Sequence, residues 1–431
     1  MKRAWLALAA ATLQVAAKGC GAPAASRSPS HAASALTPGP AATPAEGEDF
    51  AADARLLYRI AACSGHEPLP PGLDPAILDA HCEWLQRKMS AYRSVYVREA
   101  EPFLAALRPH GMPTTVVYPF GGGDLLSALT TYPDATEITT ISLEHGGDPR
   151  RLRSLDNAEL ARGLGRLRAC MNQLLTLDDS ASDALMRVER GGIPGQLAFF
   201  LVGLAVHGYE PVSLRYFRLQ PDGSLHYLSK EEIAASDSRR AQRLNRVWTA
   251  PDFSEAFSNL ELTFRAVAPE GAQAPLRIHR HIAANLSDPF LAPDGPLLRH
   301  LERKGRVAAL VKAASYLLWS QPFGNIRNYL IANADFTISD TTGIPPRYAA
   351  GAGLVQETYG SFEGTFIPAS RKESLAFQQL WRSQPKRALP FRFGYGDVHK
   401  HAHLLVTRRV AGAPAPVARY VSPPSPTPRV R

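Results

Sequence analysis

The sequence predicts an α/β fold: a Rossmann-like, mostly parallel sheet with helices on both faces, added antiparallel hairpins and an N-terminal helical cap. Three observations predict it. Segment 114–144, TTVVYPFGGGDLLSALTTYPDATEITTISLE, has the pattern of strand, glycine turn, helix and strand. Apolar residues three and four positions apart indicate helices at 157–177 and 195–208. Alternating runs at 211–229 and 259–288 indicate hairpins around turns at 221–223 and 269–271.

The N-terminus has the pattern of an export signal over residues 1–19. Lys2 and Arg3 precede an apolar stretch at 4–17. A transmembrane anchor is the alternative, but the stretch is short for a membrane span and no second one follows. The tetrapeptide Ala-Lys-Gly-Cys resembles the lipobox of bacterial lipoproteins, which implies lipidation of Cys20, although Lys18 departs from the usual pattern. We therefore expect an exported protein, lipid-anchored in the cell envelope or secreted.

Two segments have the composition of disordered chain. Residues 20–48 are rich in Ala, Ser and Pro and lack apolar periodicity, which predicts a flexible linker. Residues 409–431 are basic and Pro-rich, which predicts a disordered tail. The net charge is +9, but no basic stripe is interleaved with aromatic residues, so nucleic acid is not an expected partner.

Residues 49–107 have helical periodicity and predict the helical cap, with Asp74 and Pro75 at the start of its longer helix. Cys63 and Cys82 flank a proline-rich turn in this cap. In an exported protein a disulfide can close that loop, and two free thiols are the alternative.

Residues 108–408 predict one large α/β domain, because few linker-like stretches interrupt them. The run at 297–319, LLRHLERKGRVAALVKAASYLLW, predicts a helix that carries Lys312, Ser315 and Tyr316. A helix at 323–334 and a strand with a polar turn at 335–348 follow, then short strands at 354–364 and 389–395.

The glycine turn is the first candidate ligand site. In such a turn, here Gly121, Gly122 and Gly123, backbone N–H groups can approach a ligand at a helix N-terminus. An acid near the end of the next strand, here Glu144, can bind a ribose diol. Class I methyltransferases and dinucleotide enzymes use this arrangement, which makes S-adenosylmethionine a candidate cofactor.

The match to a nucleoside site is imperfect. Bulky Tyr118 and Phe120 stand where an acid is usual, and Leu126 replaces the last glycine of the dinucleotide motif. Asp124 would repel a phosphate, though it suits a helix N-cap. The alternative is a turn that needs glycine for its backbone geometry and binds nothing.

A second group of polar residues follows in the chain. We expect Arg327 and the turn Asp340, Thr341 and Thr342 to lie near strand ends, where open sheets bind ligands. A capped turn before Ile344 is the plain alternative.

Histidines alternate in HKHAH, so His399, His401 and His403 would share one face of a strand, a spacing that some metal sites use. A solvated edge is the alternative, as it is for His279 and His281. Nucleophile-elbow, zinc-protease and P-loop motifs are absent, which leaves hydrolase and nucleotidase classes without local support.

Four motifs in order, YPFGGGD, KAASYLLWSQPFGNIRNYLI, SDTTGIPPRY and FRFGY, resemble a family of uncharacterised secreted bacterial proteins. The likeness spans residues 115–396. Thr341 stands where that family has a second acid, and Arg392 where it has glycine. The resemblance implies an exported α/β protein and supplies no activity.

Three functional hypotheses follow. The first is a lipoprotein that binds a polar ligand or an envelope partner at the carboxyl edge of the sheet, lined by Gly121 to Asp124, Glu144, Arg327 and Asp340. The second is a methyltransferase-like enzyme, active or degenerate, with Gly121, Gly123 and Glu144 holding a nucleoside. The third is a structural lipoprotein without a small-molecule site.

Overall fold

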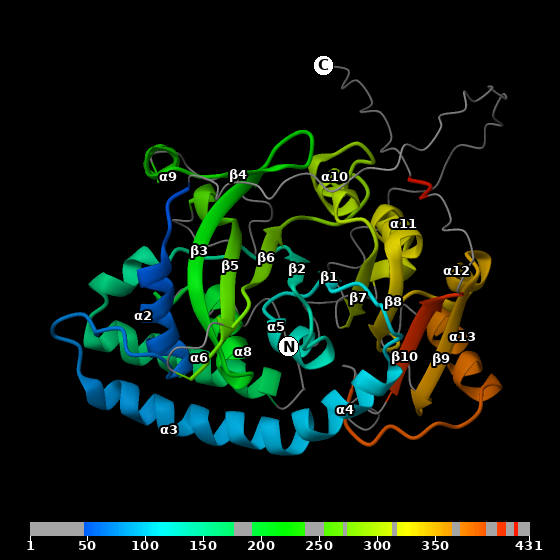
Figure 1. Cartoon of the computed structure of the whole chain (residues 1–431), viewed down its shortest axis with the longest axis horizontal. Helices are drawn as coiled ribbons and strands as arrows, with labels where there is room; N and C mark the ends of the chain where they lie inside the picture. The colour runs from blue at the N-terminus through cyan, green and yellow to red at the C-terminus, as the bar shows by residue number, and fades with distance from the viewer. Residues whose placement is uncertain are drawn as a thin grey trace. The chain divides into compact units, whose positions relative to one another are not determined.

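A mixed sheet of ten described strands runs through the structure, in the order β4-β3-β5-β6-β2-β1-β7-β8-β10-β9 (Figure 1). The strands are β1 (Thr115–Pro119), β2 (Glu137–Ser142), β3 (Tyr209–Leu219), β4 (Leu225–Tyr227), β5 (Asn259–Ala266), β6 (Arg277–Ala283), β7 (Val307–Val311), β8 (Ala334–Ser339), β9 (Leu354–Gly360) and β10 (His403–Arg409).

The computed structural model describes residues 47–175, 192–237, 254–269, 274–312, 317–363, 371–393, 403–410 and 418–420. The signal segment, Cys20, nearly all of the linker, Ser315, Tyr316, His399 and His401 lie outside the described residues. Residues Glu46–Arg431 form one compact unit. Among the described residues, no helix combines the length and the apolar composition needed to cross a membrane.

The α/β class is confirmed, whereas the prediction of a mostly parallel sheet is wrong. Strands β6, β2, β1, β7 and β8 pair in parallel, giving four parallel pairings. Five antiparallel pairings extend this parallel core at both edges. The predicted hairpins around 221–223 and 269–271 are among them, as β3–β4 and β5–β6. Strand partners far apart in the chain, such as β3 with β5, leave no local signal, so the share of antiparallel pairing was underestimated.

Helices cover both faces of the sheet, and alternate residues of each strand pack into one layer or the other. The first layer holds α2 (Ala51–Ala62), α3 (Pro75–Ala91), the π-helix η1 (Tyr92–Val97), α4 (Arg98–Leu107), α5 (Leu125–Thr131), α6 (Asn157–Leu175) and α8 (Gly195–Val206). The second holds α10 (Pro296–Arg303), α11 (Gly324–Asn333) and α12 (Pro346–Gly351). Val116 and Tyr118 of β1 face the first layer, whereas Val117 faces the second. We call the first layer the α5/α8 face.

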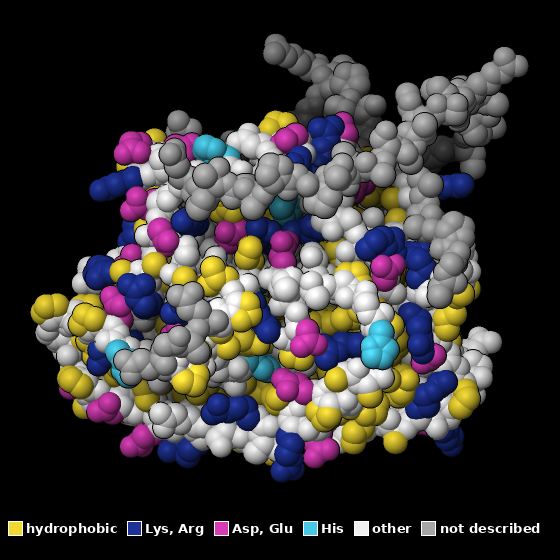
Figure 2. Space-filling view, viewed as in Figure 1, with side chains coloured by type: hydrophobic (Ala, Val, Ile, Leu, Met, Phe, Trp, Pro, Cys, Tyr) yellow, Lys and Arg dark blue, Asp and Glu magenta, His cyan; other side chains and the backbone are white. Residues whose placement is uncertain are grey.

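Smaller elements complete the described chain: α9 (Lys230–Asp237), α13 (Arg371–Ser383), and the 3₁₀ turns η2 (Arg150–Ser154), η3 (Glu255–Phe257) and η5 (Gln321–Phe323). The space-filling view shows basic, acidic and hydrophobic side chains interspersed over the face drawn (Figure 2).

The single helix expected at 297–319 is wrong. Helix α10 ends at Arg303, Gly305 takes a positive φ of 67°, and β7 follows. All five residues of β7, VAALV, are buried. A short apolar run buried on both faces carries no period-2 signal, so its sequence pattern does not distinguish strand from helix. Lys312 therefore follows a strand directly. The strand expected at 389–395 is also wrong over its described part, where only Phe393 forms a bridge.

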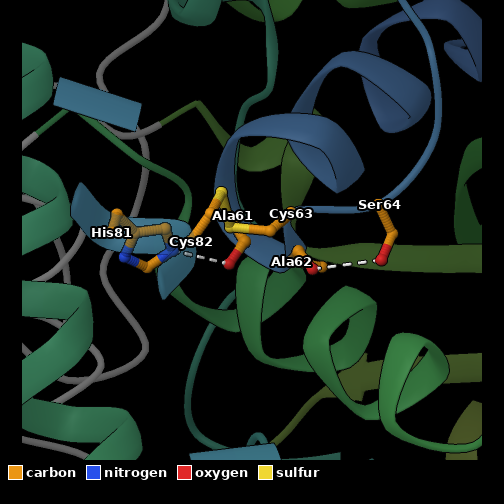
Figure 3. The surroundings of a disulfide bond; sticks show 6 residues. All are labelled: Ala61, Ala62, Cys63, Ser64, His81 and Cys82. Carbon is orange, nitrogen blue, oxygen red and sulfur yellow. Dashed lines mark hydrogen bonds between the residues drawn. A yellow bond between two sulfur atoms is a disulfide. The ribbon is translucent and has the colours of Figure 1, made fainter. Parts of the chain in front are cut away.

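A disulfide links the end of α2 to α3 within the helical cap. Cys63 at the end of α2 bonds to Cys82 in α3 (Figure 3). Beside it, His81 Nε2 donates a hydrogen bond to the Ala61 carbonyl at 3.0 Å. Asp74 caps α3 by accepting from the Ala76 N–H at 2.9 Å, where the sequence predicted the helix start.

The edge strand β9 is covered by the segment that follows α13. The Gln384 side chain accepts a hydrogen bond from the Thr358 N–H at 3.0 Å and donates to the Gln356 carbonyl at 2.7 Å. The Gly360 N–H donates to the Arg387 carbonyl at 2.8 Å. These contacts take the place of a further strand.

Candidate functional site

The predicted glycine turn connects β1 to α5, and its aspartate accepts hydrogen bonds inside the fold. Asp124 caps α5 by accepting from the Ser127 N–H at 3.0 Å. The Tyr118 hydroxyl donates to the other carboxylate oxygen at 3.0 Å. Asp124 is fully buried. The expected N-cap role of this residue is thus present in the structure.

Packing inside the protein accounts for the first glycine of the turn. A Cβ at Gly121 would lie 2.8 Å from Cγ of the Tyr118 ring, too close for any other residue. Gly122 has a positive φ of 51°, which favours glycine for conformational reasons. The Tyr118 ring therefore occupies the space beneath the turn, and the glycines have a structural explanation that requires no ligand.

Register brings three distant polar residues to one level at the carboxyl edge of the parallel core. Pairing aligns Pro119 with Ile141, and Val311 with Ser339. The next residues along the chain are Ser142, which ends β2, Lys312, directly after β7, and Asp340, directly after β8. Leu310 and Ile338 pack into the α5/α8 face. Because strand residues alternate, Lys312 and Asp340 continue on that same face.

Lys312 is the central group of this edge. It is 1% exposed, and its Nζ donates to the Ser127 hydroxyl at 3.3 Å and lies 5.0 Å from the Phe393 ring centroid. Burial lowers the pKa of Lys312, and the carboxylates of Asp124 and Asp340 oppose that shift. We call Asp124, Lys312 and Asp340 the switch-point cluster, because β1 and β7 flank the point where the order of the parallel strands reverses.

The predicted turn after β8 supplies the second carboxylate of the cluster. Asp340 accepts from the Thr342 N–H at 2.7 Å and also from the Thr342 hydroxyl. The Thr341 hydroxyl lies 3.3 Å from Nε2 of His403. A Cβ at Gly343 would lie 2.3 Å from the Ser339 hydroxyl oxygen, so this turn needs its glycine. All three predicted turn residues are fully buried.

The Phe120 side chain turns away from this polar level. In a regular strand its side chain would point to the α5/α8 face between Ser142 and Lys312. Its φ is +61°, a left-handed conformation that costs free energy in a bulky residue. The ring packs instead in the second layer, 5.8 Å from the Phe323 ring. This backbone strain at a strand end is typical of functional sites.

Glu144 lies two residues beyond the end of β2 and is 4% exposed. Burial raises the pKa of its carboxyl, and the nearby Ser142 hydroxyl opposes that rise. Among the described residues, its Oε2 has no hydrogen-bond partner. Burial also lowers the pKa of the adjacent His145, to about 3.

A hydrogen-bonded chain links β6 to the Glu144 backbone. His281 Nε2 donates to the Glu144 carbonyl at 2.8 Å, so its neutral Nδ1 accepts from the Thr140 hydroxyl at 3.0 Å. Thr140 in turn accepts from His279 Nε2 at 3.0 Å. Burial lowers the pKa of both histidines, that of His281 to about 4. His279 and His281 are thus neutral groups of the buried core and not a solvated edge.

Arg327 lies apart from the switch-point cluster. It belongs to α11 in the second layer and donates to the carbonyls of Leu318 at 2.7 Å and Ser320 at 3.0 Å. Its guanidinium lies 4.1 Å from the Tyr348 ring centroid. Burial lowers the pKa of Arg327. These contacts fix the segment after β7 and do not bring Arg327 to Asp124.

Metal ligation has no support among the described residues. They contain no group of three His, Cys, Asp or Glu side chains that could hold a metal ion. His403, the one described histidine of the HKHAH segment, packs 5.2 Å from the Phe362 ring and 6.4 Å from the Trp381 ring.

Sequence reasoning missed the role of Lys312, and it did not consider Ser127, Ser142 and Gln196. A usable signal for Lys312 was present, because a charge directly after a fully apolar run of five residues marks the end of a buried strand. For the other three, only the packing of distant elements reveals their positions.

The comparison of the chain with family models and with curated proteins found no match. The resemblance to secreted bacterial proteins therefore stays a prediction.

Proposed function

We propose that the protein is an exported bacterial lipoprotein, anchored through an acylated Cys20, that binds a small polar ligand at the carboxyl edge of its parallel strands. The observation that carries the proposal is the switch-point cluster. Open α/β sheets bind ligands in the crevice beyond the carboxyl ends of their strands, where the strand order reverses. Asp124, Lys312 and Asp340 follow three such strands, β1, β7 and β8.

Energetics favour a functional reading of this cluster. Taking three ionisable groups out of water costs free energy, and apolar residues of similar volume often stabilise a fold as well or better. A lysine with a pKa perturbed by burial and by specific carboxylates is characteristic of functional sites. The strained Phe120 at the same edge adds a second such feature.

Export has independent support in the body of the protein. The Cys63–Cys82 disulfide is of the kind that persists in oxidising compartments, outside the cytosol. Together with the signal-like N-terminus, this disulfide favours a location in the cell envelope. The proposed partner is then a membrane, contacted through the lipid, and not a nucleic acid. Labelling the expressed protein with a radioactive fatty acid, with Cys20→Ser as control, tests the anchor.

Ligand binding is tested with the purified full-length chain in a thermal-shift assay. The probes are monosaccharides, free amino acids, polyamines, nucleosides and divalent metals, since a ligand of the native state raises the melting temperature. The double variant Lys312→Met/Asp340→Asn should lose the shift. Lys372→Met, at an exposed site on α13, is the matched control and should keep it. Equal shifts in both variants, or none with any probe in the parent, would contradict the proposal.

A methyltransferase-like enzyme is the second candidate, favoured by topology. By chain order, the parallel strands β6-β2-β1-β7-β8 are third, second, first, fourth and fifth, as in Rossmann folds. Glu144 follows the second of them. The Tyr118 ring beneath Gly121 argues against a nucleoside in the turn. A shift with S-adenosylhomocysteine that disappears in Glu144→Ala would support this candidate, and the absence of any nucleoside shift would remove it.

A further inference from the structure

We propose that Ser142, Glu144 and Gln196, which we call the β2–α8 polar cluster, bind a neutral hydroxyl-rich ligand such as a sugar unit. This inference rests on the proposed function, because the cluster lies at the same edge of the sheet, on the same α5/α8 face. It adds the chemical class of the ligand and a second group of binding residues.

Strand alternation places Ser142 in the cluster. Ile138 packs into the α5/α8 face, and Thr140 bonds to the two histidines that contact α8. Ser142, two residues further along β2, therefore faces α8 as well. Its hydroxyl is close enough to affect the pKa of the Glu144 carboxyl.

Helix α8 brings Gln196 to the same place. The Phe200 ring packs 4.3 Å from the His279 ring and 5.4 Å from the His281 ring, so this side of α8 faces the sheet. Gln196 is four residues earlier, one turn along the same side of the helix. Pro194, just before α8, contacts Gly147, just beyond Glu144. The first turn of α8 thus lies over the carboxyl end of β2.

Gln196 Nε2 and Oε1 have no hydrogen-bond partner among the described residues. Glu144 Oε2 and Ser142 Oγ make no hydrogen bond of good geometry there either, although the Ser142 hydroxyl is near enough to the Glu144 carboxyl to lower its pKa. The three side chains are only 3%, 4% and 7% exposed. Buried polar groups in folded proteins are nearly always hydrogen-bonded, and several orphans at one strand end need a common explanation. A ligand that donates and accepts hydrogen bonds there supplies it.

The hydrogen-bond donors and acceptors of the β2–α8 polar cluster suit a ligand that carries hydroxyl groups. A carboxyl oxygen accepts, the glutamine amide both donates and accepts, and the serine hydroxyl does either, which complements neighbouring hydroxyls of a sugar. The carboxyl groups of Asp124, Asp340 and Glu144 outnumber the one amino group, that of Lys312, among the described residues that we assign to this edge. A phosphorylated or carboxylated ligand is therefore disfavoured, and a neutral one is preferred.

The test uses the full-length chain and its Gln196→Met variant in thermal-shift and calorimetric titrations with glucose, galactose, ribose and N-acetylglucosamine. Methionine keeps the length of the side chain but removes both orphan polar atoms, so the ligand-free variant should melt no lower than the parent. We expect at least one neutral sugar to raise the parent's melting temperature, and the variant to bind it about tenfold more weakly or worse. Glucose 6-phosphate should bind more weakly than glucose.

Exposed residues of the same type provide the control variants for this test. Gln379→Met, at an exposed position of α13, should bind sugar as the parent does. If Gln196→Met does not fold, Glu144→Gln is tested in its place, with Glu83→Gln as its exposed control. No sugar shift in the parent, or unchanged sugar affinity in the cluster variant, overturns this inference. An amine or amino-acid shift that requires Lys312 would then leave the proposed function standing, whereas no shift with any probe overturns both.

Discussion

Two groups of charges differ in their electrostatics: a partly buried group near the amino end of β2, and the buried switch-point cluster beyond the carboxyl ends of β1, β7 and β8. Near the amino end, Arg280 contacts Glu137 and Glu261, each at 2.7 Å, and Lys304 also contacts Glu137. We call these four residues the charge ladder. Burial alone would raise the pKa of Glu137, but Lys304 and Arg280 lower it to about 2. Burial would lower the pKa of Arg280, but the two carboxylates raise it.

At the carboxyl end the balance is reversed. Burial lowers the pKa of Lys312 in spite of Asp124 and Asp340. In the ladder, direct contacts outweigh desolvation for Arg280 and Glu137, which is what a stabilising network requires. In the switch-point cluster, the effect of burial on the pKa of Lys312 exceeds that of the two carboxylates. A site suited to a polar ligand keeps such incompletely compensated charges. Burial also lowers the pKa of Lys304 in the ladder, as it lowers that of Lys312. Neither burial nor the sign of one lysine's pKa shift therefore separates structural from functional groups, and the contrast lies in the pKa shifts of Arg280 and Glu137.

Breaking the ladder should have the largest effect. Arg280→Met leaves Glu137 and Glu261 without their shared partner, so the free energy of unfolding should fall by about 3–5 kcal/mol. Urea denaturation measures it. Arg303→Met is the control, because its pair with Asp222 is largely exposed and screened by solvent, so it contributes little to stability. A loss no greater than that of the control would show that the ladder is not stabilising.

The pH dependence of stability sharpens the comparison with a somewhat smaller effect. The folded-state pKa of Glu137, about 2, lies below its usual value of 4.5, so its stabilisation is complete above pH 4.5 and is lost as pH falls toward 2. Glu137→Gln should therefore be less stable than the parent by about 3 kcal/mol at pH 7, with a difference that shrinks below pH 4.5.

Buried histidines affect the stability of the protein in a neighbouring pH range. The pKa of His81 and His281 is lowered to about 4, so neutral folded histidines stabilise above pH 6.5, and that contribution falls as pH drops toward 4. They are unchanged in Glu137→Gln, so their contribution cancels in the difference between parent and variant. That difference reports the Glu137 carboxyl together with its effect on the pKa of His300. A difference that stays constant from pH 7 to pH 2 would contradict the assignment.

Neutralising part of the switch-point cluster should have the smallest effect on stability. In Lys312→Met/Asp340→Asn, the asparagine keeps an acceptor for Thr342 and no lysine charge remains buried. We expect a smaller loss than in Arg280→Met, because the carboxylate that remains, Asp124, still accepts hydrogen bonds from the Tyr118 hydroxyl and the Ser127 N–H. Urea denaturation of this variant beside Arg280→Met makes the comparison direct, and a larger loss here than in Arg280→Met would reverse it.

Local sequence predicted the parts of the fold that local chemistry determines. The β-branched runs and glycines of 114–144 predicted β1, α5 and β2, and Asp74 predicted the start of α3. The strand β7 was missed because both of its faces are buried. The position of Lys312 between Asp124 and Asp340 depends on the register of strands nearly 200 residues apart in the chain, which leaves no local pattern.

The covered edge at β9 has a consequence for how this protein can assemble. An open edge strand is a template on which another chain can add a strand, whether a functional partner or a copy of the same protein. Gln384 and Arg387 already occupy the outward N–H and C=O groups of β9. Strand addition there would first have to displace them, so a high local concentration of copies would not by itself extend their sheets through β9 into a shared fibre.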